Sequence, residues 1–483
     1  MFFQNKRLLS KSYLCEALVK LKPMRSLTAA KWLLAGLLFV AYQSQAQSKK
    51  WTLDECVEYA LQKNISIKNS ELDKQLSDIS KKDAFGSFLP SINGQASHSW
   101  NIGLNQNITT GLLENQTTQF TSAGLNASVD IYKGLQNQYR LRKANLNIVS
   151  SQYQLTKMQE DVSLNVVNAY LQIIFNKENL KVQQEQLAYD TKQLQRAQEL
   201  VDAGVVPKGD LLDVKATVAA DNQRLIAAEN ALLISKLSLA QLLQLDTFQD
   251  FDIADAAVPV QDSSVLLEDP KTVFEKAKQS RTEIKLAANN VSIAESDLKI
   301  ARGAYQPTLS GFYGFNSRVA YADRLVGYDA ATGLPVTAPP LSFFDQFSQN
   351  KGQSFGLSLN VPILNGFSTR NNVARSKVAL ERSKIALEQS ELDLERTVYT
   401  AYTDTKGALK SYEAAVSTLE SRALAFEYAK ERYEVGLMNV FDFNQAQTLY
   451  VNAQSEVLRT KYDYIFRTKI LEFYFGIPLY QKQ

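Results

Sequence analysis

Two aspartates stand at equivalent positions of two short breaks that interrupt long, regular stretches of the sequence. Asp210 ends the first break, residues 204–210, and Asp442 ends the second break, residues 436–442. Carboxylates gathered around a narrow passage favour cations and repel anions. An aspartate that begins a helix has a second use, because its side chain accepts hydrogen bonds from the first free backbone amides. The two positions therefore predict an electrostatic role, helix capping, or both.

Other reactive side chains are scarce. The chain has one histidine in 483 residues, His98, and we expect it on the apolar face of a strand in an interfacial aromatic role. The sequence contains no Gly-x-Ser-x-Gly elbow, phosphate-binding glycine-rich loop or histidine-based metal motif. We therefore predict no catalytic residue, no cofactor and no metal site, and we do not expect an enzyme.

The N-terminal region has the features of a secretory signal. Residues 32–41 form a short apolar core behind basic residues, and residues 44–46 form a cleavage signature. We expect residues 1–46 to be removed, with 1–23 as an upstream extension and Met24 as the start of translation. The apolar core is too short to span a bilayer, and we expect no later segment to cross one as a helix.

Removal of the signal changes the charge of the chain and its cysteine content. The formal charge is +3, but residues 1–46 hold seven basic side chains and one acidic one, so the remainder carries −3. Nucleic acid is therefore not an expected partner, because phosphate binding needs concentrated Lys and Arg. Cys56 is then the one cysteine left, which excludes an intrachain disulfide.

Long helices must position the two breaks. Residues 135–203 contain neither Gly nor Pro, and a second uninterrupted run covers 211–245. The same pattern returns at a constant spacing in the second half, where Gly366 corresponds to Gly134 and Gly436 to Gly204. A helix as long as the first run would extend about 100 Å. The sequence therefore predicts two long, rod-like helices, each followed by a shorter one.

The pattern inside these rods favours side-by-side packing. An apolar residue recurs every seven positions, which drives helices together, and polar residues such as Gln183 are expected on wet faces. One interpretation is a dimeric coiled-coil filament. The seven-residue repeat consists of Leu180, Leu187, Leu194 and Val201, and in the second copy of Tyr412, Leu419, Phe426 and Tyr433.

Two pairs of strands precede the long runs. Apolar and polar residues alternate in four segments, and a helical pattern over 51–88 comes before the first pair. The loop of the first pair is expected around 109–118, and the longer loop of the second pair around 319–352. Strands of this length with one apolar face can cross a bilayer, but four strands cannot close a barrel, so several chains must cooperate. The alternating segments are 91–104, 123–131, 309–316 and 354–363.

The order of these elements and the form of the second break, residues 432–447, resemble the TolC-type outer-membrane efflux proteins. The resemblance covers essentially the whole mature chain and implies a mixed fold of α-helices and a membrane β-barrel. The chain would be internally duplicated, with a first repeat at 47–245, a connector at 246–270 and a second repeat at 271–483. Its long helices would form a tunnel, and its four strands would contribute to a trimeric, 12-stranded barrel.

The resemblance also implies function and partners. Such a homotrimer would be a duct in the cell outer membrane, surrounded by lipid, with its helical tunnel projecting into the periplasm. It would serve a tripartite efflux system or a type I secretion system, together with a periplasmic adaptor protein and an inner-membrane pump of the RND or ABC type. The alternative from another class is a trimeric coiled-coil adhesin of the autotransporter kind, although its strands would all be C-terminal.

The resemblance assigns roles to residues at the two breaks. A periplasmic entrance would be formed by Asp442, Asp210, Asp213 and Tyr433. The hairpin tips that dock the adaptor would be formed by Gly204, Val205, Gly436 and Leu437. Met438 and Gln445 stand where some members of the family have an arginine and a second aspartate, so the contact that holds the entrance shut is expected to be weaker or differently built.

Overall fold

The fold is described from a computed structural model of the chain. Residues 1–49, 108–110, 246–248, 250, 255–263 and 479–483 lie outside the described residues, so the expected signal at 1–46 falls outside them as well. The chain divides into two compact units, and almost all described residues belong to the second, Trp51–Gln249 with Ile253–Gln483. The following account concerns this second unit.

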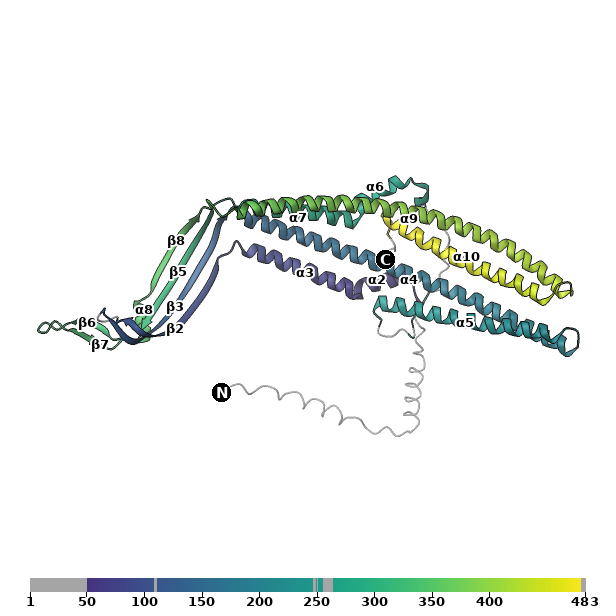
Figure 1. The fold of residues 1–483 in the computed structure, drawn as a ribbon, viewed down its shortest axis with the longest axis horizontal. Helices are drawn as coiled ribbons and strands as arrows, with labels where there is room; N and C mark the ends of the chain where they lie inside the picture. The colour runs from purple at the N-terminus through teal and green to yellow at the C-terminus, as the bar shows by residue number, and fades with distance from the viewer. Residues whose placement is uncertain (1–49, 108–110, 246–248, 250, 255–263, 479–483) are drawn as a thin grey trace, which may run out of the picture. The chain divides into compact units, whose positions relative to one another are not determined.

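The long strands and helices follow the order that the sequence predicts (Figure 1), but the helical pattern over 51–88 forms two helices that meet at Asn64, because the Asn64 side chain caps the second one. Each half runs from two shorter helices through a pair of long strands to a helix of 67 residues and a helix of 36 residues. The first half contains β1 (Lys50–Trp51), α2 (Leu53–Lys63), α3 (Ile65–Gly86), β2 (Ser91–Gln106), β3 (Leu113–Lys133), α4 (Gln136–Asp202) and α5 (Lys208–Leu243). Between the halves lie β4 (Asp252–Ile253) and the 3-10 turn η1 (Ser264–Leu267). The second half contains α6 (Pro270–Ser280), α7 (Thr282–Gly303), β5 (Thr308–Ala320), β6 (Arg324–Tyr328), β7 (Pro335–Ala338), α8 (Phe343–Gln349), β8 (Gly352–Asn360), α9 (Ser368–Glu434) and α10 (Val440–Phe475).

The helices repeat without an insertion. α6 and α7 have the same lengths as α2 and α3, and α9 and α10 have the same lengths as α4 and α5. The turns between the long and the shorter helices, 203–207 and 435–439, are equally long as well. The predicted long helices are confirmed to within one residue at each end. The shorter helices begin three residues earlier than predicted, because residues 208–210 and 440–442 already form a helical first turn.

Four long strands form an antiparallel sheet in the order β2-β3-β5-β8. The alternation places apolar side chains of all four strands on one face, since Leu125 lies opposite Phe315 and Tyr313 lies opposite Phe355. The other face carries mostly small and polar residues such as Asn126 and Ser354, with Phe120 and Phe312 as exceptions. The sheet therefore has one apolar side and one polar side, as the sequence predicts.

One expectation about the loops is wrong. β3 begins at Leu113, within the predicted loop 109–118, because its polar residues still pair with β2 through the backbone, which needs no apolar side chain. The longer loop of the second pair lies where the sequence predicts it, between the end of β5 at Ala320 and the start of β8 at Gly352. It contains the β6–β7 hairpin and α8, and the amide of Gln346 anchors α8 by donating to the carbonyl oxygen of Ala320 and accepting from its N–H group.

The long helices pack on several neighbours, and α4 contacts α3, α5, α7 and α10. Two equivalent tyrosines tie the long helices to segments near the connector. The hydroxyl of Tyr170 donates to the carbonyl oxygens of Trp51 and Ala254, and that of Tyr402 donates to the carbonyl oxygen of Leu266. The expectation that Gln183 faces water is wrong, because only 8% of it is exposed.

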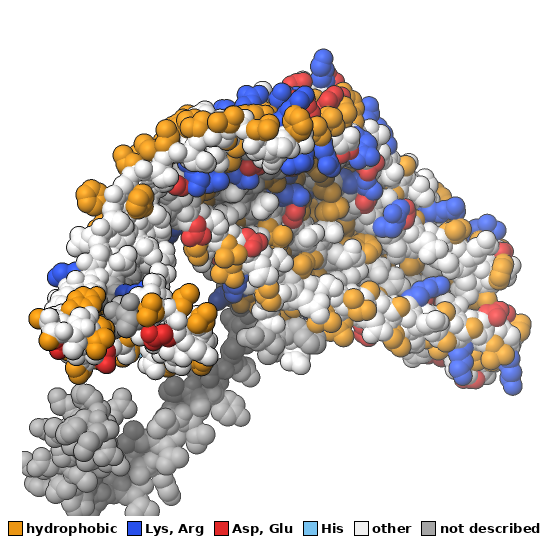
Figure 2. All heavy atoms as spheres, turned by 60° about the vertical axis from the view of Figure 1, so that its left-hand side comes forward, with side chains coloured by type: hydrophobic (Ala, Val, Ile, Leu, Met, Phe, Trp, Pro, Cys, Tyr) orange, Lys and Arg blue, Asp and Glu red, His pale blue; other side chains and the backbone are white. Residues whose placement is uncertain are grey.

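Among the described residues, α5 is the one helix long and apolar enough to cross a membrane by length and composition. This differs from the expectation that no segment after the signal could do so. Its face toward α4 buries Asp221 and Ser235, and the two helices run side by side. We interpret α5 as a packing helix of the bundle. In the view of Figure 2, charged side chains are concentrated on the helices, whereas the strands carry mostly apolar and uncharged ones.

Candidate functional site

The candidate site comprises the tips of two helical hairpins, α4–α5 and α9–α10. At each tip the chain leaves the long helix through a glycine with a left-handed backbone, Gly204 (φ 72°) and Gly436 (φ 75°). The next residue closes the turn, since the N–H of Val205 donates to Leu200 and the N–H of Leu437 donates to Arg432. These hydrogen bonds satisfy carbonyl groups that the end of the long helix leaves without a partner. The turn requires a residue that tolerates positive φ, and glycine occupies that position in both hairpins.

The shorter helices are not capped by the predicted aspartates. Asp442 is the third residue of α10, and its backbone N–H donates to Oδ1 of Asn439, 2.8 Å away, so Asn439 is the N-cap. The Asn439 amide also donates to Asp442 Oδ2 over 2.9 Å. In the first hairpin Pro207 is the N-cap without a side-chain bond, and Asp210 is again the third residue. An acidic residue in the first turn interacts favourably with the helix dipole, but it is not the cap.

The structure brings Tyr433 to the other hairpin. Its ring stacks on Phe443 with centroids 4.5 Å apart, and it packs beside an apolar cluster of Ala197, Val214 and Val440. Burial raises the pKa of the Tyr433 hydroxyl, nearby Arg196 lowers it, and nearby Asp210 raises it further. Tyr433 and Asp210, from different hairpins, are therefore electrostatic neighbours.

The remaining predicted residues lie at the surface of the tips. Asp213 and Asp442 are exposed, and Asp210 is half-buried. The exposed side chains of Val205 and Leu437 leave apolar surface at both turns, and Phe441 beside Asp442 is 71% exposed. Exposed apolar residues clustered at a helix tip are typical of a surface that contacts a partner.

Sequence reasoning missed three features of this region. Asn439 stands three residues before Asp442, which is the spacing of an N-terminal capping pair, and that signal was available. Phe426 stacks on Tyr450 with centroids 5.2 Å apart and contacts Phe443 at 5.7 Å, which extends the aromatic stack of Tyr433. The third feature is a buried polar layer further along α4, which only the packing of three helices reveals.

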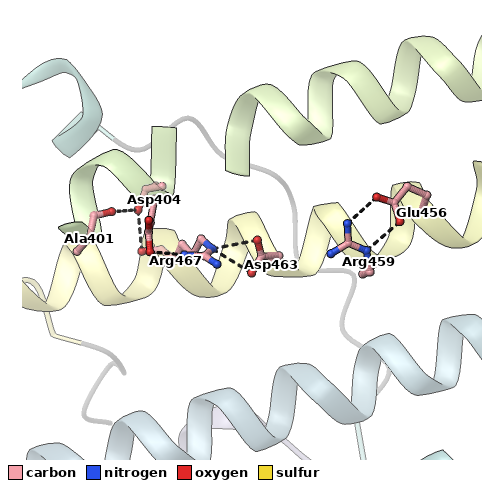
Figure 3. Close-up of polar contacts among 7 residues, drawn as sticks. Ala401, Asp404, Glu456, Arg459, Asp463 and Arg467 are labelled. Atoms are coloured by element: carbon pink, nitrogen blue, oxygen red, sulfur yellow. Dashed lines mark hydrogen bonds and ion pairs between the residues drawn. The ribbon is translucent and has the colours of Figure 1, made fainter. Parts of the chain in front are cut away.

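One ion pair joins α9 and α10 away from the tips, and two more lie within α10. Figure 3 shows Arg467 of α10 between Asp463 of its own helix and Asp404 of α9, with Nη1 of Arg467 2.6 Å from Asp404 Oδ2. Arg459 pairs with Glu456 on the same face of α10. These side chains are partly exposed, so each pair contributes little to stability on its own. Within the residues that the structure describes, no three His, Cys, Asp or Glu side chains gather as a metal site requires.

Comparison with known proteins identifies the family to which these features correspond. A family model described as "Outer membrane efflux protein" matches residues 57–244 and 273–475, one segment in each half of the chain. No match was found among curated protein sequences.

Several solved structures share the fold. The CmeC outer membrane channel of Campylobacter jejuni has a TM-score of 0.70 at 19% identity, over 88% of this chain and 85% of that one. The outer membrane protein VceC of Vibrio cholerae has a TM-score of 0.72 at 14% identity, over 88% and 96%. The MtrE outer membrane channel of Neisseria gonorrhoeae, in its open state, has a TM-score of 0.68 at 16% identity, over 89% of each chain.

Proposed function

Because the chain belongs to the outer membrane efflux protein family, we propose that it is the outer-membrane duct of a tripartite efflux system or a type I secretion system. Three copies would form a barrel in the outer membrane and a helical tunnel in the periplasm. The observation that carries the proposal is the four-stranded sheet, which has one apolar face and two edges without a partner strand among the described residues.

The sheet edges are the first argument for assembly. β2 and β8 lie at the two edges, and they run in opposite directions because every neighbouring pair in the sheet is antiparallel. β8 of one copy can therefore pair antiparallel with β2 of the next. An open edge is not viable in hydrocarbon, and three copies would close a barrel of twelve strands. The apolar face, with Ile102 83% and Phe355 84% exposed, would then meet lipid.

Exposed helix faces are the second argument. Apolar side chains recur every seven residues on α3 and on α9, and each of them is at least 41% exposed. A seven-residue apolar stripe that faces water favours packing against another helix. We propose that the stripe on α9 of one copy packs on the next copy. The α3 stripe contains Ile65, Leu72 and Ile79, and the α9 stripe contains Val378, Ile385, Leu392 and Tyr399.

The hairpin tips would then converge at the periplasmic end, far from the sheet. Threefold symmetry would place three copies of Asp442 around the entrance, and the ring of carboxylates would favour cations. Asp210, Asp213 and Tyr433 would line the same region, with Asp210 beside Tyr433. The exposed turns at Gly204, Val205, Gly436 and Leu437 would dock the periplasmic adaptor, which links the duct to an RND or ABC pump.

The adhesin alternative finds no support in the comparisons. Its strands would all follow the coiled coil, whereas the four long strands here come in two pairs, each preceding a long helix. A dimeric coiled-coil filament is also disfavoured, because a filament of helices accounts for none of these four strands. Since the family consists of transport channels, we propose that the chain has no enzymatic activity.

Two measurements test the duct directly. Mass determination after gentle detergent extraction should give three chains, and a monomer would contradict the barrel. Reconstitution into planar bilayers should give discrete conductance steps that depend on the trimer. A trimer that inserts into the membrane but does not conduct would agree with the proposed assembly and contradict the proposed duct.

A topology experiment separates the orientation from the assembly. A small tag beside Gly333, in the turn between β6 and β7, should react with a label on intact cells, because long loops of such barrels lie outside. A matched tag beside Gly204 at a hairpin tip should react only after the outer membrane is opened. The reverse pattern would mean that the chain is inverted.

A further inference from the structure

A buried layer of polar side chains crosses the helical bundle near the hairpin tips. It consists of Asp190 from α4, Asp221 from α5 and Gln447 from α10, and each is at most 2% exposed. Seven residues nearer the tip, the equivalent layer is the apolar cluster Ala197, Val214 and Val440. Because helices packed in a seven-residue repeat stack in such layers, the polar layer occupies positions where the repeat normally has apolar residues.

Both side-chain oxygens of Asp190 accept hydrogen bonds. Its Oδ1 accepts from the amide of Gln447 at 2.7 Å, and its Oδ2 accepts from the amide of Gln186 at 2.5 Å. The Gln447 amide therefore links α10 directly to α4.

Asp221 is in the opposite situation. Its Oδ1 accepts from Nη1 of Arg224 at 2.9 Å, but its Oδ2 has no hydrogen-bond partner among the described residues. Asp190 is buried in the same layer and interacts electrostatically with Asp221. Two charged carboxylates cannot donate to each other, so Oδ2 remains unsatisfied unless one of them carries a proton. Burial first, and then Asp190, raise the pKa of Asp221 to about 7, against the lowering effect of Arg224.

We propose that Asp190 and Asp221 share one proton, and that this protonated pair with Gln447 is a clasp that holds α10 against the α4–α5 hairpin. Oδ2 of Asp221 carries the proton and donates it in a hydrogen bond to Asp190. Loss of that proton to water leaves two negative charges in a buried site. Arg224 compensates them only in part, because it reaches Asp221 from one side and is half-exposed.

Among the described residues, few charged groups lie near the Asp190–Asp221 pair. Little therefore offsets a second negative charge there, and the clasp is sensitive to pH. The charged groups that face Asp221 are Asp190 from α4 and Arg224 from its own helix, and α10 contributes the neutral Gln447. Tyr189, next to Asp190, keeps its proton because burial raises its pKa. Since the pKa of Asp221 is raised in the folded state, the stabilisation is complete below its usual value of 3.8 and is lost as pH rises through about 7.

The clasp would regulate the proposed duct. Gln447 lies five residues after Asp442 in α10, so release of α10 from α4 would free the turns that carry the entrance carboxylate. This consequence rests on the proposed function, but the clasp itself does not. It can therefore be tested on the purified protein without measuring transport.

Infrared difference spectroscopy tests the shared proton, because a buried protonated carboxyl group absorbs apart from a carboxylate. Titration of the wild-type protein should show one such group per chain, lost with a midpoint near pH 7. Asp221→Asn should abolish the signal. Glu185→Gln, an equivalent change at an exposed residue of α4, should leave the signal unchanged. Absence of the group in the wild type, or its persistence in Asp221→Asn, would overturn the proposal.

Hydrogen exchange of the amides 440–450 tests the mechanical consequence, after correction for the intrinsic pH dependence of exchange. In the wild type, exchange should accelerate as pH rises and level off above about 7. Asp221→Asn should remain protected throughout, because its amide still donates to Asp190. Equal acceleration in this variant would contradict a proton clasp.

Asp190→Asn provides a second, independent variant if Asp221→Asn does not assemble. Without the neighbouring charge, the midpoint of Asp221 should move to lower pH by about one unit or more. An unchanged midpoint would overturn the coupling between the two carboxyl groups. Variants that alter stability equally at every pH would show that the layer sets helix register and nothing else.

Discussion

The α4–α5 and α9–α10 hairpins have helices of the same lengths, turns of the same form and glycines at the same position of the turn. Their interiors differ. The second hairpin contains an aromatic stack in which Tyr433, Phe443 and Phe426 are joined by Tyr450. The equivalent residues of the first hairpin are all aliphatic, namely Val201, Leu211, Leu194 and Val218.

For buried charged residues the first hairpin is the special one. Asp190 and Asp221 of the first hairpin correspond to Arg422 and Ala453 of the second, and neither of these repeats the buried acidic pair. The duplicated backbone thus carries two kinds of interior: a buried acidic pair in the first hairpin and an aromatic stack in the second. The comparison teaches that the turn and the seven-residue repeat fix the backbone, while the side chains between them are free to diverge.

The largest effect is expected from the aromatic stack. Phe443→Ala removes a buried ring that is 2% exposed, and we expect a loss of about 3–5 kcal/mol in the local stability of the α9–α10 tip. The equivalent change in the first hairpin, Leu211→Ala, removes a smaller, half-buried side chain and should cost about half as much. Hydrogen exchange of the tip amides measures both losses of stability. Equal losses would contradict the claim that the two interiors differ in their contribution to stability.

The turn glycines test what the hairpins share. Gly204→Ala and Gly436→Ala should each cost about 1–2 kcal/mol, because the left-handed backbone is strained for alanine although its side chain would meet no atom within 4 Å. The costs should be equal within error. Gly407→Ala, in the interior of α9 with equally open space, should instead stabilise by about 0.5–1 kcal/mol. Unequal costs at the two turns would mean that the backbones are not equivalent.

The caps provide a smaller contrast. Asn439→Ala should destabilise the start of α10 by about 1 kcal/mol, because the N–H of Asp442 loses its acceptor. Asn439→Ser keeps a cap oxygen and should retain most of the stability. The first hairpin has no side-chain cap to lose, since Pro207 occupies the position. Hydrogen exchange of the amides in the first turn of α10 measures the loss of stability. Equal exchange in the Ala and Ser variants would contradict the role of Asn439 as the N-cap.

The smallest effect concerns the entrance carboxylates and rests on the proposed duct. Asp442→Asn should lower the preference for cations over anions by roughly 1.5- to 5-fold, which corresponds to an exposed charge effect of about 0.2–1 kcal/mol. Asp210→Asn should change it less, because Asp210 is half-buried beside Tyr433. Reversal potentials in planar bilayers measure both. Unchanged selectivity with an intact trimer would leave Asp442 as a first-turn residue that interacts with the helix dipole.

Much of the fold could be predicted from the sequence because it depends on local order. A run without Gly or Pro determines where a long helix begins and ends, and α4 and α9 follow the predicted runs to within one residue. Alternation determines which face of a strand is apolar. Because equivalent residues such as Gly204 and Gly436 are separated by a constant spacing, the elements predicted for the first half also predict those of the second half. The family resemblance is confirmed by the match over both halves.

Only the tertiary structure decided which polar residues are buried and which cap a helix. Asp190 and Gln183 look like surface residues of a long helix, but both are buried. The burial of Asp190 depends on α5 and on α10, which lies in the other half of the chain. Asp442 is suited to an N-cap, but the backbone turns at Asn439, three residues earlier, and the cap follows the turn. The spacing of residues along the sequence determines where helices and strands begin and end. Burial and hydrogen bonding depend instead on which helices, distant in the sequence, pack together.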